Sequence, residues 1–349
     1  NSIAASGKWR TLWRCCIATG NRVTTEPQRR VANILAPRVI YAAGVAHEHD
    51  TERPPQDRLG GLALAALALI WGSAWSLTKY GLAYVEPYTF AAVRSVLSVA
   101  CLFILVLILR RPLRPVALGL TTIIGLLQTS GFVALTMWSL YHSGAGRTSV
   151  LTYTMPFWLL LLPWIVLGER LHRWQWLAVI LALCGLVLVI QPWQLNGIAA
   201  SLTAVAGGFV WATSAIVAKV LHRHHRVDDL SLTAWQMLLG TPVLIFIAVL
   251  TYTGPPEWTA GLVGVLAFNV VLANGVAWAL WLFALRTLSA AGAGLGTLAV
   301  PVVGVLTAWV QLGERPGAVE GAGMALIIAA LALLSTREII VTRLRQRSQ

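Results

Sequence analysis

From Leu59 to about residue 336, the chain alternates long apolar stretches with short polar breaks. Within each stretch the apolar residues follow one another without the strict apolar and polar alternation of a half-buried strand. A helix crosses a bilayer in roughly 20 mostly apolar residues and satisfies its own backbone hydrogen bonds in lipid. The pattern therefore predicts an all-α integral membrane protein with ten transmembrane helices. We expect these helices near residues 62–82, 88–109, 116–139, 146–167, 174–190, 198–220, 231–252, 261–284, 290–311 and 318–336.

The two ends of the chain lack this pattern. Residues 1–58 carry scattered Arg, Pro, Gln, His and Asp and contain no apolar run long enough to cross a membrane. We expect this segment to be disordered or an artefact of the gene model. Because the first methionine is Met137, we expect translation to start at a later valine such as Val31 or Val45. Residues 337–349 are expected to form a basic cytoplasmic tail.

The composition supports a membrane protein. Of the 349 residues, 57% are hydrophobic and 11% are charged, whereas a soluble domain carries about 25% charged residues. A formal net charge of +13 would suggest a nucleic-acid partner in a soluble protein. Here the arginines lie in the tails and between apolar stretches, which is the positive-inside pattern. With ten spans, the basic breaks lie on the same side of the membrane as the two termini. These breaks contain Arg110, Arg111, Arg114, His172, Arg173, Arg223 and Arg226.

This distribution of charge predicts the location of the protein. We expect a multi-pass protein of the bacterial cytoplasmic membrane with both termini in the cytoplasm. Its partners are then the lipid bilayer and a small-molecule substrate, without nucleic acid.

A sequence pattern recurs in two halves of the membrane region, 59–190 and 197–336. A tryptophan precedes a lysine by eight residues in WGSAWSLTK, which starts at Trp71, and in WATSAIVAK, which starts at Trp211. A proline, Pro156 or Pro301, precedes a Gly-Glu-Arg triplet by twelve residues in each half. Because each half contains five predicted spans, an odd number, the second half must enter the membrane from the opposite side. The pattern therefore predicts two inverted five-helix repeats, which are typical of secondary transporters.

Several motifs carry a resemblance to a known family. They are WGSAWSLTKYGL from Trp71, AAVRS around Arg94, Trp138 at the end of the third span, AGRTSVLTYTMP ending at Pro156, and LGER at 167–170. Together they resemble the EamA family of the drug/metabolite transporter superfamily over about residues 60–336. The resemblance implies ten helices, an inverted five-plus-five arrangement, and export or exchange of small metabolites, amino acids or amphiphilic compounds without ATP hydrolysis. The chain also lacks the GxxxxGK(S/T) loop that binds nucleotide phosphates.

Charged residues within membrane spans are costly, so each one is a candidate functional residue. Arg94 lies about 9 Å into the second span at 1.5 Å per residue. Its guanidinium either faces a substrate cavity or reaches a lipid headgroup. Lys79 and Lys219 lie near span ends, where they either line the cavity or extend to the interface. In the second half, Gln236 occupies the position that corresponds to Arg94, so only one half carries this cation.

The acidic residues have a different distribution. All 13 lie in tails, in breaks or at span ends, so no span carries a mid-membrane carboxylate. With Lys and Arg as the only candidates for buried charge, an anionic or zwitterionic substrate is favoured over a cationic one. Glu169 and Glu314 each follow a glycine at the end of a span, where capping of neighbouring amides is favoured over substrate contact. Pro156 and Pro301 are expected to kink their spans, either to expose backbone to a cavity or to aid packing.

Aromatic and amide side chains in span interiors are further candidates for lining a substrate cavity. The aromatic candidates are Trp71, Trp75, Trp138, Tyr153, Trp211, Trp278 and Trp281. Others among the 16 tryptophans, such as Trp193 and Trp258, are expected to act as anchors at the membrane interface. Gln128, Asn269 and Asn274 either face the cavity or bond a neighbouring helix.

These features favour a secondary carrier that exports or exchanges a small molecule. A membrane enzyme would need clustered His, Asp or Cys at one membrane face. The cluster of His222, His224 and His225 lies beside arginines in a polar break, so surface charge is favoured there over a metal site. The alternative is a non-transporting scaffold or sensor, which predicts no substrate-dependent flux. We expect no cofactor and no metal. A homodimer is compatible with the interpretation as a secondary carrier.

Overall fold

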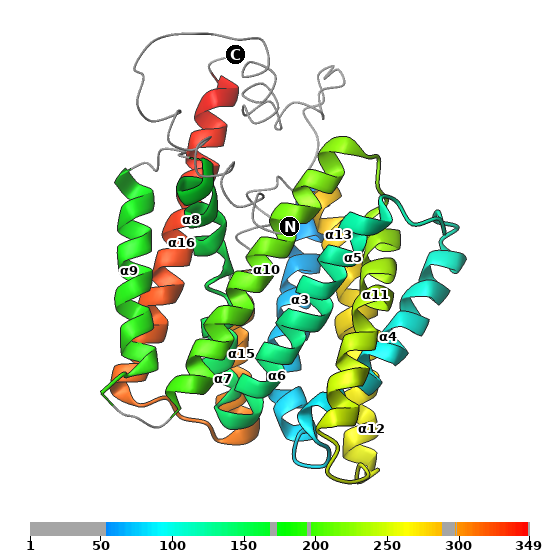
Figure 1. The fold of residues 1–349 in the computed structure, drawn as a ribbon. Coiled ribbons are helices and arrows are strands. Elements are labelled where there is room, and N and C mark those ends of the chain that lie inside the picture. Colours follow the sequence, from blue (N-terminus) through cyan, green and yellow to red (C-terminus); the bar gives the residue numbers. More distant parts are fainter. Residues whose placement is uncertain (1–53, 168–172, 194–196, 288–296, 298, 348–349) are drawn as a thin grey trace, which may run out of the picture. The chain divides into compact units, whose positions relative to one another are not determined.

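The computed structural model describes residues 54–167, 173–193, 197–287, 297 and 299–347. Every regular element in this part of the chain is a helix (Figure 1). Seven helical segments in it are long and apolar enough to cross a membrane, and two shorter apolar helices follow at Ala299–Leu312 and Ala318–Leu333. The predicted helical membrane fold is therefore present. The predicted extension up to residue 53, Glu169, and residues 290–296 of the ninth predicted span lie outside the described residues.

The helices follow the order of the predicted spans. The first half forms α3 (Pro54–Gly81), α4 (Pro87–Ile108), α5 (Leu118–Ile124), η1 (Gly125–Gly131), α6 (Phe132–His142), α7 (Ala145–Thr152), α8 (Met155–Leu167) and α9 (Arg173–Ile190). The second half forms α10 (Ile198–His224), α11 (Asp229–Leu250), α12 (Ala260–Ala267), η2 (Phe268–Val276), α13 (Ala277–Thr287), α15 (Ala299–Leu312) and α16 (Ala318–Arg347).

The first helix begins before the predicted fold boundary. The described part of α3 begins at Pro54, although the segment up to residue 58 was expected to lie outside the fold. The apolar span itself starts at Leu59, so the helix is about one turn longer than its apolar part.

The fourth predicted span, 146–167, is not one continuous helix. α7 ends at Thr152 and α8 begins at Met155. Pro156 lies in the first turn of α8, where a proline fits well. In a continuous helix, its ring would clash with the carbonyl of Thr152, and a backbone hydrogen bond would be lost. Pro301 lies within α15, whose described part begins at Ala299.

Each half contains a π-helical segment in the middle of its third span. In the first half η1 connects α5 to α6, and in the second half η2 connects α12 to α13. These segments contain Gln128 in η1 and Asn269 and Asn274 in η2. Short π-helical segments inside α-helices occur frequently at functional sites.

Helices α4 and α11 form an antiparallel pair, which lies at one side of Figure 1. Glu86 caps the start of α4, and its Oε1 also accepts a hydrogen bond from Thr251 Oγ1, at the end of α11, over 3.0 Å. Asp228 caps the start of α11, and its Oδ2 accepts one from Arg111 Nη1, just beyond the end of α4, over 3.4 Å. The start of each helix therefore lies beside the end of the other.

Two other helix crossings depend on glycine. At the contact of α9 with α16, a Cβ added to Gly185 would lie 2.7 Å from the carbonyl oxygen of Gly323. At the contact of η1 with α11, a Cβ added to Gly240 would lie 2.3 Å from the carbonyl oxygen of Gly125. A side chain at either crossing would push the backbones apart. Small residues allow this close approach between membrane helices.

Candidate functional site

Aromatic pairs join the two halves in the interior of the helix bundle. Trp71 in α3 meets Trp278 in α13 edge to face, with ring centroids 6.0 Å apart. The indole Nε1 of Trp71 also donates to the carbonyl oxygen of Ala273, over 3.0 Å. Trp211 in α10 meets Phe132 in α6, with centroids 5.1 Å apart. The repeated tryptophan of each half therefore contacts the third span of the other half.

Tyr153 and the remaining tryptophans have varied surroundings. Tyr153, in the break between α7 and α8, is buried and lies 6.0 Å from Trp211, ring centroid to centroid. Trp75 and Trp281 are partly buried and pack against the apolar core. Trp138 packs against His142 at the end of α6, with centroids 4.3 Å apart.

The amide side chains bond neighbouring helices. Asn274 Nδ2 donates to Ser98 Oγ in α4 over 2.8 Å. Asn269 Oδ1 accepts from Thr78 Oγ1 in α3 over 3.3 Å. Gln128 Oε1 accepts a long hydrogen bond, 3.4 Å, from Ser214 Oγ in α10. All three residues come from the π-helical segments, so η1 and η2 supply polar links between helices.

Arg94 has an unsatisfied buried atom. Its Nε is buried and has no hydrogen-bond partner among the described residues. The same holds for Oε1 of Gln236, its predicted counterpart in α11, whose side chain is buried. A buried donor or acceptor without a partner costs about 1–3 kcal/mol. Arg94 and its predicted counterpart Gln236 thus both carry a buried polar atom without a partner among the described residues.

Arg94 lies on the helix face that carries the first of two contacts leading to the aromatic pair. Ser98 follows Arg94 by four residues on α4, so the two lie on the same face of the helix. Ser98 bonds Asn274, and Trp278 follows Asn274 by about one helical turn and contacts Trp71. Polar and aromatic contacts therefore follow one another along the boundary between the halves, starting from the face of α4 that carries Arg94.

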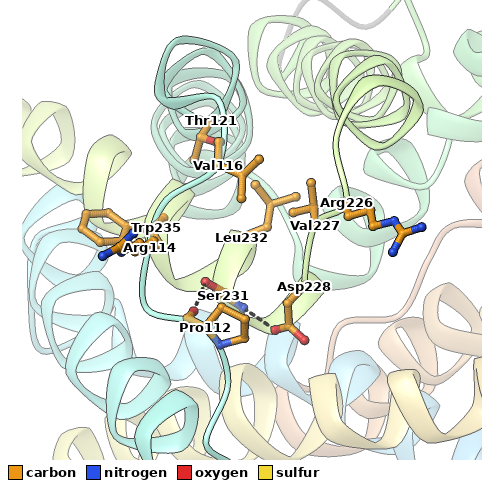
Figure 2. Close-up of a pocket in the computed structure, with 10 residues that line it drawn as sticks. All are labelled: Pro112, Arg114, Val116, Thr121, Arg226, Val227, Asp228, Ser231, Leu232 and Trp235. Carbon is orange, nitrogen blue, oxygen red and sulfur yellow. Dashed lines mark hydrogen bonds between the residues drawn. The ribbon is translucent and has the colours of Figure 1, made fainter.

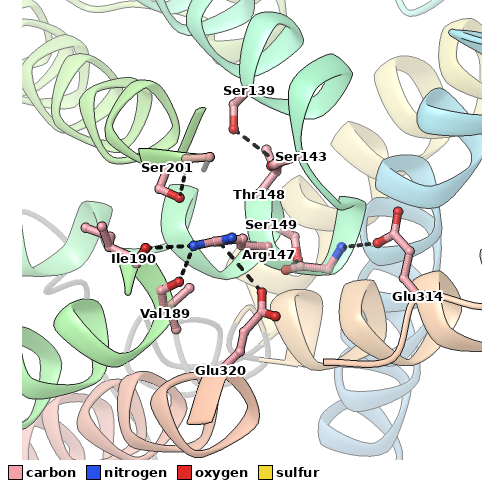
Figure 3. A network of polar contacts seen from close by, with 12 residues as sticks. Ser139, Ser143, Arg147, Thr148, Ser149, Val189, Ile190, Ser201, Glu314 and Glu320 are labelled. Atoms are coloured by element: carbon pink, nitrogen blue, oxygen red, sulfur yellow. Dashed lines mark hydrogen bonds and ion pairs between the residues drawn. The ribbon is translucent and has the colours of Figure 1, made fainter. Parts of the chain in front are cut away.

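Four charged residues gather at the end of the bundle where α3 ends, and Figure 3 shows three of them, Arg147, Glu314 and Glu320. We call Lys79, Arg147, Glu314 and Glu320 the charged network. Arg147 Nη2 donates to the carbonyl oxygens of Val189 and of Ile190, the latter over 3.0 Å, at the end of α9. Its Nε lies 3.7 Å from Oε1 of Glu320 in the first turn of α16.

The other two members of the charged network hold the turn between α6 and α7. Lys79 Nζ donates to the carbonyl oxygens of Leu140 and Tyr141 over 2.7 and 2.9 Å, at the end of α6. Glu314 Oε2 accepts from the amide of Gly146, in the first turn of α7, over 3.3 Å. Cations thus lie at helix C-termini and an anion at a helix N-terminus, the signs that the helix dipole favours.

Sequence reasoning missed Arg147 and Glu320. Arg147 belongs to the quoted motif AGRTSVLTYTMP, and its charge at the start of a span was the available signal. Lys79 was expected either to line a cavity or to extend to the interface, and its ammonium group bonds a helix end. Its counterpart Lys219 is exposed.

The histidine cluster shows no metal site. His222 Nε2 lies 2.8 Å from Oδ1 of Asp229. In the described part of the chain, no three residues of His, Cys, Asp or Glu are grouped so that they could hold a metal ion.

Comparison with known proteins adds information on both sequence and fold. Residues 58–191 and 198–336 match the EamA-like transporter family. The chain is similar to the uncharacterized transporter YoaV of Bacillus subtilis, with 26% identity covering 73% of this chain and 89% of that protein. It is also similar to the probable amino-acid metabolite efflux pump of Salmonella typhimurium, with 28% identity covering 78% of this chain and 94% of that protein. A known crystal structure superposes with a TM-score of 0.57 at 18% identity, covering 80% of this chain and 98% of the other, which is a likeness of fold alone.

Proposed function

The chain belongs to the EamA-like transporter family, and on that premise we propose that it is a secondary carrier working by alternating access. Its substrate is a small metabolite, an amino acid or an amphiphilic compound, which it exports or exchanges across a bacterial cytoplasmic membrane. Among these classes, amino acids and their metabolites are the favoured substrates. The relative named as a probable amino-acid metabolite efflux pump supports this order.

Two inverted five-helix repeats are the architecture that we propose. Matched features in the two halves support it: a π-helical segment in the third span, an acidic cap on the second, and a tryptophan in the first. The antiparallel pairing of α4 with α11 supports opposite orientations, because these are the second spans of their halves. Inverted repeats place substrate near the midplane between the halves.

The observation that carries the proposal is the linkage of the two halves at one end. Arg147 of the first half forms an ion pair with Glu320 of the second half, and the amide of Gly146 donates a hydrogen bond to Glu314. If both termini are cytoplasmic, α3 ends on the outer side, and the charged network closes the outer side of the bundle. Alternating access then requires these bonds to break when the carrier opens outward.

The interior suggests how a zwitterionic substrate would bind. Arg94 would pair with a carboxylate, and the rings of Trp71 and Trp278 would cover the apolar part of the molecule. An arginine and a carboxylate form a strong charge-assisted hydrogen bond in a site shielded from water.

Counterflow in liposomes tests the proposal. The protein is reconstituted, the liposomes are loaded with an unlabelled amino acid, and uptake of the labelled compound is followed. A carrier exchanges the two pools, so label accumulates transiently above its equilibrium level. A non-transporting scaffold or sensor gives the leak of empty liposomes for amino acids and for other small metabolites, and that result would reject the proposal.

A further inference from the structure

A small pocket with two arginines lies at the end of the bundle opposite the charged network. The loop between α4 and α5 folds over the start of α11 and leaves a pocket of about 50 Å³. Figure 2 shows Val116, Val227 and Leu232 in the middle, with Arg114 beside Trp235 on one side and Arg226 on the other. We call this the arginine pocket. A metabolite site usually measures about 300–1,000 Å³, so the arginine pocket holds no more than part of a ligand.

Hydrogen bonds hold the loop of this pocket in place. Ser231 Oγ donates to the carbonyl oxygen of Pro112 over 2.7 Å, and Trp235 Nε1 donates to that of Leu113 over 2.8 Å. On the other side, Thr121 Oγ1 donates to the carbonyl oxygen of Val116 over 2.8 Å. The loop is therefore attached to both α11 and α5, and the position of Arg114 between these attachments follows from them.

The two carboxylates near the pocket already have hydrogen-bond or ion-pair partners. Asp228 accepts from the amide of Ser231 and pairs with Arg111. Asp229 pairs with His222. Arg114 and Arg226 are exposed, and the described residues provide neither with a hydrogen bond or an ion pair. The arginine pocket thus has two available cations and no free anion of its own.

We propose that the arginine pocket binds the phosphodiester headgroup of an anionic phospholipid. The pocket lies in the basic breaks that face the cytoplasm in the expected orientation, and anionic lipids attract basic segments there. Exposed leucines, Leu109, Leu113 and Leu118, lie on the loop and at the neighbouring helix ends, where they meet acyl chains. Trp235, with a bonded N–H and an apolar ring, suits the boundary between headgroup and chain.

Lipid-dependent stability of the full chain tests this site. The purified protein is delipidated in detergent, and its unfolding midpoint is measured while phosphatidylglycerol or phosphatidylcholine is added. We expect phosphatidylglycerol to raise the midpoint of the wild type and phosphatidylcholine to leave it unchanged. In the R114A/R226A variant, the phosphatidylglycerol concentration needed for half of the rise should increase about thirtyfold, since each arginine near a membrane surface contributes about fivefold.

An arginine at the other end is the matched control. Arg315 is exposed and follows the charged-network residue Glu314, so R315A removes one charge far from the pocket. R315A should respond to phosphatidylglycerol as the wild type does. An equal loss in R315A would mean that total charge alone attracts the lipid, and an unchanged response in R114A/R226A would mean that the pocket does not bind it. Either result would overturn the proposal.

Two further arms complete the test. Inorganic phosphate is added in place of lipid, and a stabilisation that it reproduces in the wild type but not in R114A/R226A would assign the pocket to a free anion and reject the lipid. An R114K/R226K variant keeps both charges. It should retain most of the response to phosphatidylglycerol, and its unfolding midpoint without lipid should match that of the wild type, which separates lipid binding from a folding defect.

Discussion

The Nε atom of Arg147 lies 3.7 Å from Oε1 of Glu320, and this contact joins the start of α7 to the first turn of α16. The two side chains are 19% and 20% exposed, so solvent screens the pair only in part. Arg147 also donates to carbonyl oxygens at the end of α9. One side chain therefore links three helices from both halves at the same end of the bundle.

Removing Arg147 should open this end of the protein. A Val150→Cys reporter, whose native side chain is fully buried in α7, is placed in a background with the native cysteines changed to serine. With Arg147→Ala, labelling by a membrane-impermeant thiol reagent outside the cell should become about tenfold faster, because charge-assisted hydrogen bonds of about 1.5–3 kcal/mol are lost. The control is Arg315→Ala, which should label at the original rate. Equal labelling rates for all three proteins would contradict the closing role of Arg147.

Lys79→Met should destabilise the fold by about 1.5–3 kcal/mol, because two helix-end carbonyls lose a charged donor. Lys219 is exposed and is the predicted counterpart of Lys79, so Lys219→Met is a matched control that should change the unfolding free energy by about 0.5 kcal/mol or less. Unfolding in a denaturant series measures both variants. Equal losses would show that the bonds of Lys79 do not stabilise the fold.

Gly185→Ala should destabilise the protein by about 1–3 kcal/mol, because the added methyl group overpacks the crossing of α9 and α16. Gly264→Ala is the control, since nothing lies within 4 Å of a Cβ added at Gly264 in α12. That change should be neutral or stabilising, as alanine is the better helix former. Thermal unfolding distinguishes the two, and a stable Gly185→Ala variant would mean that the helices separate there at little cost.

Arg94→Met should reduce amino-acid counterflow at least about tenfold if the guanidinium binds the substrate carboxylate. Its unfolding midpoint should be unchanged or higher, because methionine replaces a cation whose buried Nε has no partner among the described residues. This combination separates a binding role from a structural role, which would lower the midpoint as well. Full counterflow in a folded Arg94→Met protein would remove Arg94 from the site.

Part of the candidate site was visible in the sequence. The repeated spacing indicated that Trp71 corresponds to Trp211 and that Arg94 corresponds to Gln236. It did not show that Trp71 meets Trp278 or that Asn274 bonds Ser98, because these partners are separated by many residues. Equal spacing of residues in the sequence indicates which positions of the two halves correspond. Which residues are in contact depends on how the helices pack.

The sequence by itself determined that the chain is a helical membrane protein, where most spans lie, and which family it resembles. It could do so because a helix in lipid satisfies its backbone hydrogen bonds locally. An apolar run of sufficient length therefore indicates a membrane-spanning helix without knowledge of its neighbours. The tertiary structure decided that the fourth predicted span divides into α7 and α8, and that Arg147 contacts both Glu320 and the end of α9. A buried polar side chain must find its partner in three dimensions, so its role follows from the packing of whole helices and not from its place in the chain.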